Sequence, residues 1–293
     1  MNPPRRRPAP TASLFCLLSL AGISRAAEVT SPVPRSPDVR SQAVLVIDQA
    51  TSSVIYSRHA SEAAPIASIT KLMTALVVLD GQQSLDEEVS ITNVDRTRTQ
   101  NLPSRLAVGT KLTRRELLQL ALMSSENRAA QALATSYTGG EAAFLKAMNA
   151  RAATLGMVNS KFEDPTGLSD HNVASPNDLV RLVTAANQNA LIREYSTARA
   201  YSVRVGRQQI EFHNTNPLVR DPAWQVSVQK TGHIAAAGQC LVLQALVDGR
   251  DVVIVLLNSF GKYTRVADAR RIRKWMGPTQ AVAAVAAVTQ PGT

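Results

Sequence analysis

Residues 65–79 read PIASITKLMTALVVL, and this stretch decides the fold. It places Ser68 and Lys71 three positions apart, at the start of a run rich in Leu, Met and Ala that contains no Gly. Three positions along a helix put two side chains on one face, whereas a strand would put them on opposite faces. The stretch therefore predicts a buried helix, beginning after Pro65, that brings a serine hydroxyl within reach of a lysine amine.

The same S-x-x-K spacing occurs at two other serines, which the local pattern separates from Ser68. Ser227 lies in the alternating run 224–230, which predicts a strand. Ser259 follows the apolar run 252–257, so it is expected at a strand end. Only Ser68 satisfies the helical geometry; its alternative interpretation is a helix N-cap.

Two tripeptides have the form S-x-N. Ser125-Glu126-Asn127 lies between two helical patterns, at 114–123 and 128–136, where a helix–helix junction can point polar side chains into a cleft. The other begins at Ser175 and continues with Pro and Asn, which is the chemistry of a helix start. The first tripeptide is therefore the functional candidate.

The tripeptide K-T-G occurs once, as Lys230-Thr231-Gly232. It is expected to end a strand, and two further strands are expected after Gly238. The chain thus carries S-x-x-K, S-x-N and K-T-G in this order, each in a suitable local context.

The ordered motifs resemble those of the low-molecular-mass penicillin-binding proteins, in particular their D-alanyl-D-alanine endopeptidase branch. The resemblance covers about residues 40–277. Many relatives, including the β-lactamases, carry Asp in the middle of S-x-N, and Glu126 resembles the endopeptidase branch instead. The resemblance extends to four more stretches, at residues 123–129, 164–169, 230–243 and 260–264.

Strands are expected at both ends of the chain and helices between them, which argues for one antiparallel sheet whose ends meet, plus a helical lobe. The resemblance implies an α/β fold like that of serine β-lactamases and DD-transpeptidases. In it a five-stranded antiparallel sheet is flanked by helices, and the active-site cleft lies between sheet and lobe. Strands are expected at 43–48, 53–56, 225–230, 239–246 and 252–257, and helices over about 113–190 and 264–276.

The resemblance implies a catalytic role for three residues. Ser68 would be the nucleophile, and Lys71 would take its proton if burial and a neighbouring cation, Lys230, lower the lysine pKa. Ser125 would relay a proton to the leaving amine.

Substrate-binding roles are implied for the other motif residues. Asn127 would hold the substrate amide, and Lys230 would hold a substrate carboxylate with help from Thr231. Gly232 and His233 complete the substrate-binding set, and the backbone amides of Ser68 and His233 match the family's oxyanion-hole positions.

Residues 1–26 have the form of a secretory signal, with three arginines before a short apolar core and small residues at the expected cleavage site. The further expectations are a flexible lead-in at 27–41, a catalytic domain at 42–277 and an Ala/Val-rich tail at 278–293. The signal predicts a periplasmic protein without a transmembrane anchor. Its removal takes away four arginines and no acids, so the net charge falls from +10 to +6, which suits an anionic cell-wall polymer.

Several other classes lack support. The four histidines show no zinc-type spacing with acids, and no metal or cofactor is expected. Nucleic-acid binding is not expected, because no arginine-rich run follows the signal. Cys240, the one cysteine after the signal, lies in an apolar run and is expected to be buried and inert.

The resemblance leaves four functions to compare. The leading one is an endopeptidase that cuts D-alanyl cross-links in peptidoglycan and is inhibited covalently by β-lactams. The alternatives are a carboxypeptidase that trims terminal D-alanine, a class A β-lactamase, and a non-catalytic penicillin-binding wall protein. The β-lactamase is disfavoured because the acids Glu163 and Asp164 stand in a stretch that resembles the peptidases.

Overall fold

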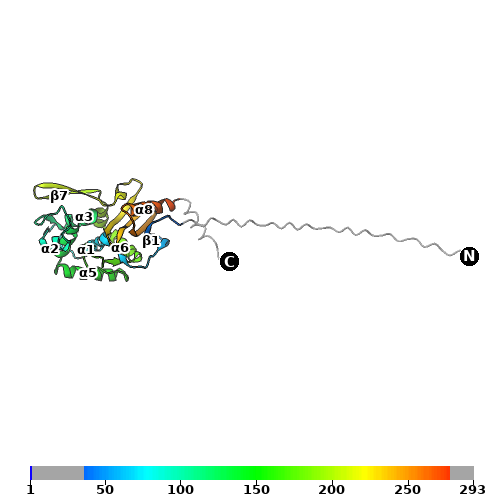
Figure 1. Ribbon diagram of the computed structural model, residues 1–293, viewed down its shortest axis with the longest axis horizontal. Helices are drawn as coiled ribbons and strands as arrows, with labels where there is room; N and C mark the ends of the chain where they lie inside the picture. The colour runs from blue at the N-terminus through cyan, green and yellow to red at the C-terminus, as the bar shows by residue number, and fades with distance from the viewer. Residues whose placement is uncertain (2–35, 278–293) are drawn as a thin grey trace. The chain divides into compact units, whose positions relative to one another are not determined.

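The computed structural model describes Met1 and residues 36–277, and these contain a five-stranded antiparallel sheet (Figure 1). The strands stand in the order β2-β1-β11-β10-β9. The expected α/β architecture with an antiparallel five-stranded sheet is confirmed. The strand bounds are Ser41–Asp48 for β1, Val54–Arg58 for β2, Gln225–Ile234 for β9, Gly238–Val247 for β10 and Arg250–Ser259 for β11.

The first and last strands of the chain meet inside this sheet. β1 pairs with β11 in antiparallel register, with Ala43 opposite Leu257 and Asp48 opposite Val252. Both strands are rich in Val, Ile and Leu, which suits a position covered on both faces. Motifs that lie far apart in the sequence can therefore reach one site.

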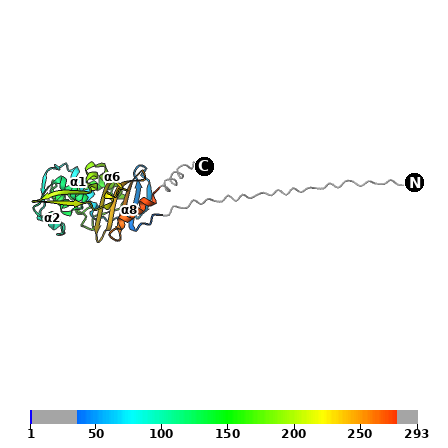
Figure 2. The same cartoon turned by 90° about the horizontal axis from the view of Figure 1, so that it is seen from above.

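Alternation along the strands gives the sheet two apolar faces. One face, which includes Val44 and Ile254, packs against the buried side of helix α8 (Thr264–Trp275), and Figure 2 shows α8 against the strands. The opposite face, which includes Leu45 and Val255, belongs to the larger core shared with the helices. The last helix was expected at 264–276, and the structure places its apolar side against the sheet.

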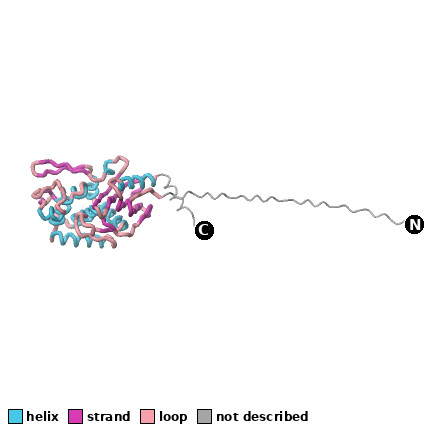
Figure 3. The backbone as a smooth tube through the Cα atoms, viewed as in Figure 1, coloured by secondary structure: helices cyan, strands magenta, loops and turns pink. Residues whose placement is uncertain are grey.

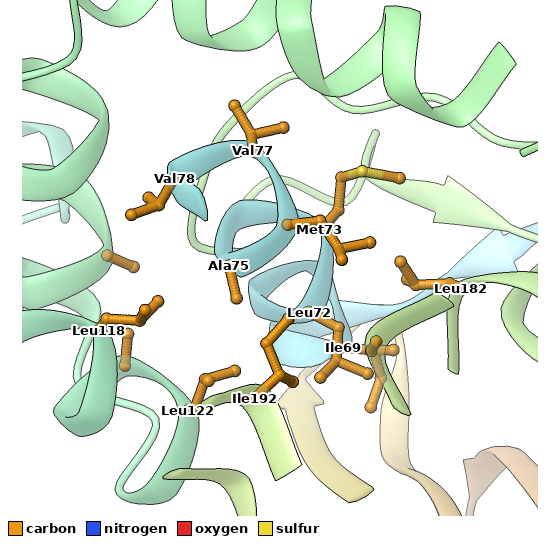
Figure 4. Packing of buried hydrophobic residues seen from close by; sticks show 14 of the residues in the cluster. Ile69, Leu72, Met73, Ala75, Val77, Val78, Leu118, Leu122, Leu182 and Ile192 are labelled. Atoms are coloured by element: carbon orange, nitrogen blue, oxygen red, sulfur yellow. The ribbon is translucent and has the colours of Figure 1, made fainter. Parts of the chain in front are cut away.

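Helix α1 runs through the middle of the helical lobe. All its residues from Thr70 to Val78 are buried. Figure 4 shows its side chains leaving in several directions, with Leu118 and Leu122 on one side and Leu182 on another. A helix that is apolar all round belongs in the interior of a protein, as the sequence run predicted. The other helices are α2 Asn93–Arg98, α3 Arg114–Met123, α4 Asn127–Thr135, α5 Gly140–Thr154, α6 Pro176–Gln188 and α7 Ala190–Thr197.

Three small two-stranded sheets were not predicted from the sequence. The most extended is the hairpin of β7 (Ala200–Val205) and β8 (Gln208–His213), drawn in magenta at the top of Figure 3. The remaining short elements are β3 Ala64–Pro65 with β6 Val173–Ala174, β4 Glu88–Ser90 with β5 Lys111–Thr113, and the 3-10 turns η1 Ala67–Ile69 and η2 Pro217–Arg220.

One strand boundary was predicted wrongly. The K-T-G tripeptide does not end its strand, because β9 continues to Ile234, where His233 and Ile234 still pair with Gln239 and Gly238 of β10. Gly232 interrupts the apolar pattern of the sequence but not the backbone pairing. The pattern alone therefore placed the end of the strand too early.

The secretory signal expected at residues 1–26 and the tail expected at 278–293 lie outside the described residues, apart from Met1. The first described strand begins at Ser41, one residue before the expected start of the catalytic domain. Within residues 36–277, none of the helices is both long and apolar enough to cross a bilayer.

Candidate active site

Ser68 lies in the tight turn η1, immediately before helix α1. It is not a cap of that helix, because the N-cap position is Ile69 and no side chain caps the first turn. The preceding residue, Ala67, has a left-handed φ of +48°, a conformation that costs a non-glycine residue about 1 kcal/mol or more. The backbone is thus held in a special shape directly before the predicted nucleophile.

Lys71 lies one turn on, and its Nζ is 2.8 Å from Ser68 Oγ. The same Nζ donates to Asn127 Oδ1 at 2.7 Å and to the backbone oxygen of Thr166 at 2.7 Å. The predicted contact between serine and lysine is therefore present, and the lysine has no carboxylate among these partners.

The side chain of Lys71 is completely buried. Burial lowers the pKa of Lys71 to about 7, although the negative charges of Asp164 and Glu126 act in the opposite direction. Desolvation disfavours the ammonium form because water no longer surrounds the charge. At neutral pH a substantial fraction of this amine can therefore accept a proton.

The loop 163–172 holds the carbonyl of Thr166 against Lys71. One oxygen of Asp164 accepts hydrogen bonds from the backbone of Thr166 and Gly167, at 2.6 and 2.7 Å, and the other accepts from Ser169 at 2.8 Å. The sequence drew attention to this stretch only through its resemblance to the family.

Ser125 occupies the junction between α3 and α4, as predicted. Its φ is +61°, again left-handed for a residue with a β-carbon. Its hydroxyl accepts a hydrogen bond from Lys230 Nζ at 2.9 Å. Glu126 caps α4 by accepting from the amide of Arg128 at 3.1 Å, and Asn127 is the first residue of that helix.

Lys230 comes from strand β9 and is also completely buried. Burial, followed by the positive charges of Lys71 and Arg265, holds the pKa of Lys230 well below its usual range. Its Nζ also donates to the backbone oxygen of Thr231 at 2.9 Å. The positive charge of Lys71 therefore lowers the pKa of Lys230, whereas the pKa of Lys71 is lowered by burial and not, as expected, by Lys230.

Two glycines allow distant segments to pack against the turn Ala67–Ile69, which carries the predicted nucleophile Ser68 and which we call the nucleophile turn. At Gly167, which has φ +84°, a β-carbon would lie 2.0 Å from the backbone oxygen of Ala67. At Gly232 it would lie 2.9 Å from the oxygen of Ile66 and 3.1 Å from Ser68 N. Strand β9 thus passes directly beside Ser68, and both Ser68 and His233 line the cavity described next.

A cavity of about 530 Å³, which we call the cleft, opens in front of these groups. The two lysines lie behind its wall rather than in its lining. Arg265 of α8, which the sequence reasoning missed, lines the cleft and donates to the oxygen of Gly232 at 2.7 Å. Its only sequence signal was its place just after the family-like stretch 260–264. The lining residues are Ser68, Gln100, Leu102, Ser125, Asn127, Leu168, Thr215, Thr231, Gly232, His233, Ile234, Ala235 and Arg265.

The competing motif copies have structural roles. Ser227 lies within β9 and Ser259 at the end of β11, as predicted. Ser175 caps α6, accepting from the amide of Asp178 at 3.2 Å. Cys240 is buried as expected, and burial raises the pKa of its thiol to about 11. Across the described part of the chain, no group of three or more His, Cys, Asp or Glu side chains could hold a metal ion.

Comparison with known proteins agrees with this geometry. Residues 29–261 match the peptidase S11 family, described as D-alanyl-D-alanine carboxypeptidase. The chain is 44% identical to a Pseudomonas aeruginosa protein named D-alanyl-D-alanine endopeptidase, over 94% of this chain and 90% of that one. It is 41% identical to an Escherichia coli protein of the same name, over 90% and 87%. The crystal structure of the Streptomyces K15 DD-transpeptidase is similar, with a TM-score of 0.76, 29% identity, and coverage of 82% and 98%.

Proposed function

The chain belongs to the D-alanyl-D-alanine carboxypeptidase family, peptidase S11, and from this premise we propose that it hydrolyses D-alanyl cross-links of peptidoglycan through an acyl-enzyme on Ser68. Family membership makes it a serine-type D-alanyl-D-alanine peptidase. The observation that carries the proposal is the 2.8 Å contact between Ser68 Oγ and Lys71 Nζ, because the amine has a pKa of about 7. A neutral amine at that distance can act as the general base for a serine hydroxyl.

In the first half of the reaction, Ser68 Oγ attacks the D-alanyl carbonyl carbon while its proton passes to Lys71. The amides of Ser68 and His233 stabilise the negative charge that develops on the carbonyl oxygen. Ser125, bonded to Lys230, is placed to relay this proton from Lys71 to the leaving amine as the carbon–nitrogen bond breaks, which leaves Lys71 neutral for the second half. In the second half, water attacks the ester, Lys71 takes a proton from the water, and Ser68 regains its hydroxyl proton.

The residues that line the cleft indicate which groups would contact the substrate. Asn127 accepts from Lys71 through its Oδ1, which leaves its amide nitrogen for a substrate carbonyl. Thr231 and Arg265 face the cleft and can receive a carboxylate of the leaving group. Lys230, which the sequence placed in contact with that carboxylate, acts from behind them through Ser125.

The choice of endopeptidase rests on the relatives at 44% and 41% identity, both of which carry that name. The second candidate is a carboxypeptidase, favoured by the description of the family and by a Streptomyces relative at 30% identity with that name. Both reactions use the same acyl-enzyme and differ only in the leaving group.

The same acylation would make β-lactams covalent inhibitors. We place the enzyme in the periplasm, where peptidoglycan lies, because residues 1–26 have the form of a secretory signal. The net charge of +6 after removal of that segment suits contact with an anionic wall polymer.

Two measurements test the proposal. A labelled penicillin should attach to Ser68, as read by peptide mapping, and Ser68→Ala should take up none while Ser227→Ala labels normally. Purified muropeptide dimers should be split into monomers faster than free pentapeptide loses D-alanine. A label elsewhere would refute the nucleophile, and preferential trimming of pentapeptide would favour the carboxypeptidase.

A further inference from the structure

The middle residue of the S-x-N tripeptide contacts a different segment from its two neighbours. Ser125 and Asn127 line the cleft, whereas Glu126 is not among the residues that line it. The Oε1 atom of Glu126 accepts a hydrogen bond from Ser104 Oγ at 2.9 Å and another from the amide of Arg128 at 3.1 Å. One carboxylate oxygen therefore joins the start of α4 to a residue 22 positions earlier in the chain.

Ser104 belongs to the segment 99–106, which is neither helix nor strand. Leu102 of this segment lines the cleft. The Ser104 hydroxyl also accepts a hydrogen bond from the amide of Leu106 at 3.0 Å, so it is held from two sides. The partner of Glu126 is thus part of the segment that supplies a wall of the cleft.

A second residue of α4 holds the same segment. The buried Arg128 guanidinium donates to the backbone oxygen of Leu106 at 2.8 Å and to that of Leu102 at 3.1 Å. Backbone carbonyls outside regular structure need partners of this kind where water does not reach them. Glu126 and Arg128 together therefore fasten the segment to the first turn of α4.

The junction that carries the tripeptide needs support. Ser125 has a left-handed φ of +61°, a conformation that persists in a residue with a β-carbon only where the surrounding structure holds it. Its hydroxyl lies 2.9 Å from Lys230 Nζ, and Asn127 Oδ1 lies 2.7 Å from Lys71 Nζ. Both side chains flank Glu126 in the chain, so a hydrogen bond that holds Glu126 supports both contacts.

We propose that Glu126 is a positioning residue: its hydrogen bond from Ser104 keeps Ser125 and Asn127 in contact with the two lysines and fixes them relative to the cleft wall at Leu102. The inference rests on the proposed function in taking Ser68 as the acylated serine. Glutamate suits this role because its side chain reaches Ser104 while the same oxygen caps α4. Aspartate, which is shorter by one methylene group, would keep the cap and lose Ser104.

Three substitutions separate the hydrogen bond from the charge. Ser104→Ala removes the bond and leaves the carboxylate. Glu126→Asp keeps the charge and the cap but withdraws the carboxylate from Ser104, and Glu126→Gln keeps an acceptor for both bonds but removes the charge. The first two variants should each lower kcat and the maximal rate of penicillin acylation about five- to tenfold, with KM changed less than about threefold, because misplaced groups mainly weaken the transition state.

The pH profile of acylation is a readout that a loss of stability would not move. Asp164 and Glu126 are the carboxylates that raise the pKa of Lys71, and Lys230 is the cation whose own pKa Lys71 lowers. Ser104→Ala leaves both carboxylates charged, so the rise should stay near its wild-type pH while the maximal rate falls. Glu126→Gln should move the rise to lower pH and keep the maximal rate.

Ser84→Ala is the matched control. Ser84 Oγ accepts from the amide of Asp86, two residues on, at 3.3 Å, as Ser104 Oγ does from Leu106. Ser84 is exposed, and within residues 36–277 its hydroxyl has no carboxylate partner. This variant should change the acylation rate less than about twofold, and an equal loss in Ser84→Ala and Ser104→Ala would contradict the role of Glu126.

Two further variants test whether Ser104 and Glu126 act through one bond. Ser104→Thr keeps the hydroxyl and should retain the wild-type rate. The double variant Ser104→Ala/Glu126→Asp should lose no more than either single variant, because both changes remove the same bond. Losses that multiply in the double variant, or a wild-type rate in Ser104→Ala, would overturn the inference.

Hydrogen exchange separates this inference from the proposed function, because it does not depend on turnover. In Ser104→Ala the amides of residues 102–106 and of residues 124–128 should both exchange about tenfold faster, while those of α6 should not change. Faster exchange confined to residues 102–106 would overturn the inference. A wild type that is not acylated at Ser68 would refute the proposed function, and the exchange result would still decide whether Glu126 holds the junction.

Discussion

Basic side chains lie beyond both faces of the central sheet, but their surroundings differ completely. On the cleft side, Lys71 and Lys230 are fully buried, and their hydrogen-bond partners are hydroxyl, amide and carbonyl oxygens. On the other side, helix α8 presents cations toward solvent. Arg270, whose side chain is 54% exposed, pairs with Asp221 at 3.0 Å.

The difference shows what turns a cation into a reactive group. A charge that keeps its water or meets a carboxylate stays charged, and its pKa stays high. A lysine that loses its water without gaining a carboxylate partner moves toward the neutral amine, as the pKa of about 7 for Lys71 shows. Burial without a carboxylate partner therefore separates Lys71, the proposed general base, from the exposed cations of α8.

The largest expected effect comes from removing Lys71. Lys71→Met keeps the length and apolar stem of the side chain but removes the base, so penicillin acylation should fall about a thousandfold or more. Lys274→Met on α8 is the matched control and should change the rate less than twofold. Acylation rates, together with circular dichroism to verify folding, measure both. Comparable losses of acylation rate in the two variants would contradict the distinction between the lysines on the two sides of the sheet.

A second test compares two glycines with similar left-handed φ angles, +84° at Gly167 and +79° at Gly249. The β-carbon added in Gly249→Ala would meet no atom within 4 Å. This variant should therefore lower the free energy of unfolding by about 1 kcal/mol, from backbone strain alone. Gly167→Ala also collides with Ala67 and should lose about 3 kcal/mol. Denaturant titration measures both values. Equal losses would mean that the nucleophile turn can move aside.

Arg265 and Arg270 provide a comparison on one helix. Arg265→Gln should raise the substrate concentration for half-maximal cleavage about tenfold with kcat nearly unchanged, because a charged hydrogen bond to the substrate carboxylate is lost. Arg270→Gln, which faces away from the cleft, should change neither quantity. Steady-state kinetics on muropeptide dimers separate the outcomes, and a fall in kcat alone would argue against a binding role for Arg265.

The smallest expected effect concerns the pH dependence. Acylation of the wild type should rise with pH through about 7, as Lys71 loses its proton. Glu126 raises this pKa, so Glu126→Gln removes a charge that favours the ammonium form and should move the rise to lower pH by less than one unit. The remaining side-chain oxygen can still cap α4. Glu62→Gln, an exposed change at a carboxylate that does not act on the pKa of Lys71, is the control, and a rise moved to higher pH would contradict the assignment.

The sequence predicted those features that depend on local pattern. The apolar run after Ser68 predicted the buried helix, and the alternating run before Lys230 predicted its strand. The polar tripeptide between two helical patterns predicted the junction at Ser125. Their meeting in one site was predicted by resemblance, since no local pattern reports contacts between residues 105 positions apart, such as Ser125 and Lys230.

What the sequence did not predict depends on packing across the fold. Arg265 looks like any surface arginine until α8 is placed beside Gly232. Lys230 was expected to hold a substrate carboxylate, but the hydrogen bond from its amine to Ser125 depends on how β9 packs against the α3–α4 junction and was not predicted. The β7–β8 hairpin was missed because its residues are mostly exposed and its apolar alternation is short.

The glycine contacts around Ser68 have a consequence for selectivity. The nucleophile turn is held from one side by Gly167 and from the other by Gly232, with no room for a single methyl group at either position. We expect such a closely packed centre to contribute little to selectivity by induced fit, because the turn that carries Ser68 could move only together with Gly167 and Gly232. Discrimination between substrates then has to come from static complementarity along the cleft walls. New specificities in this fold should therefore arise by changes in those walls, while the residues around the serine stay as they are.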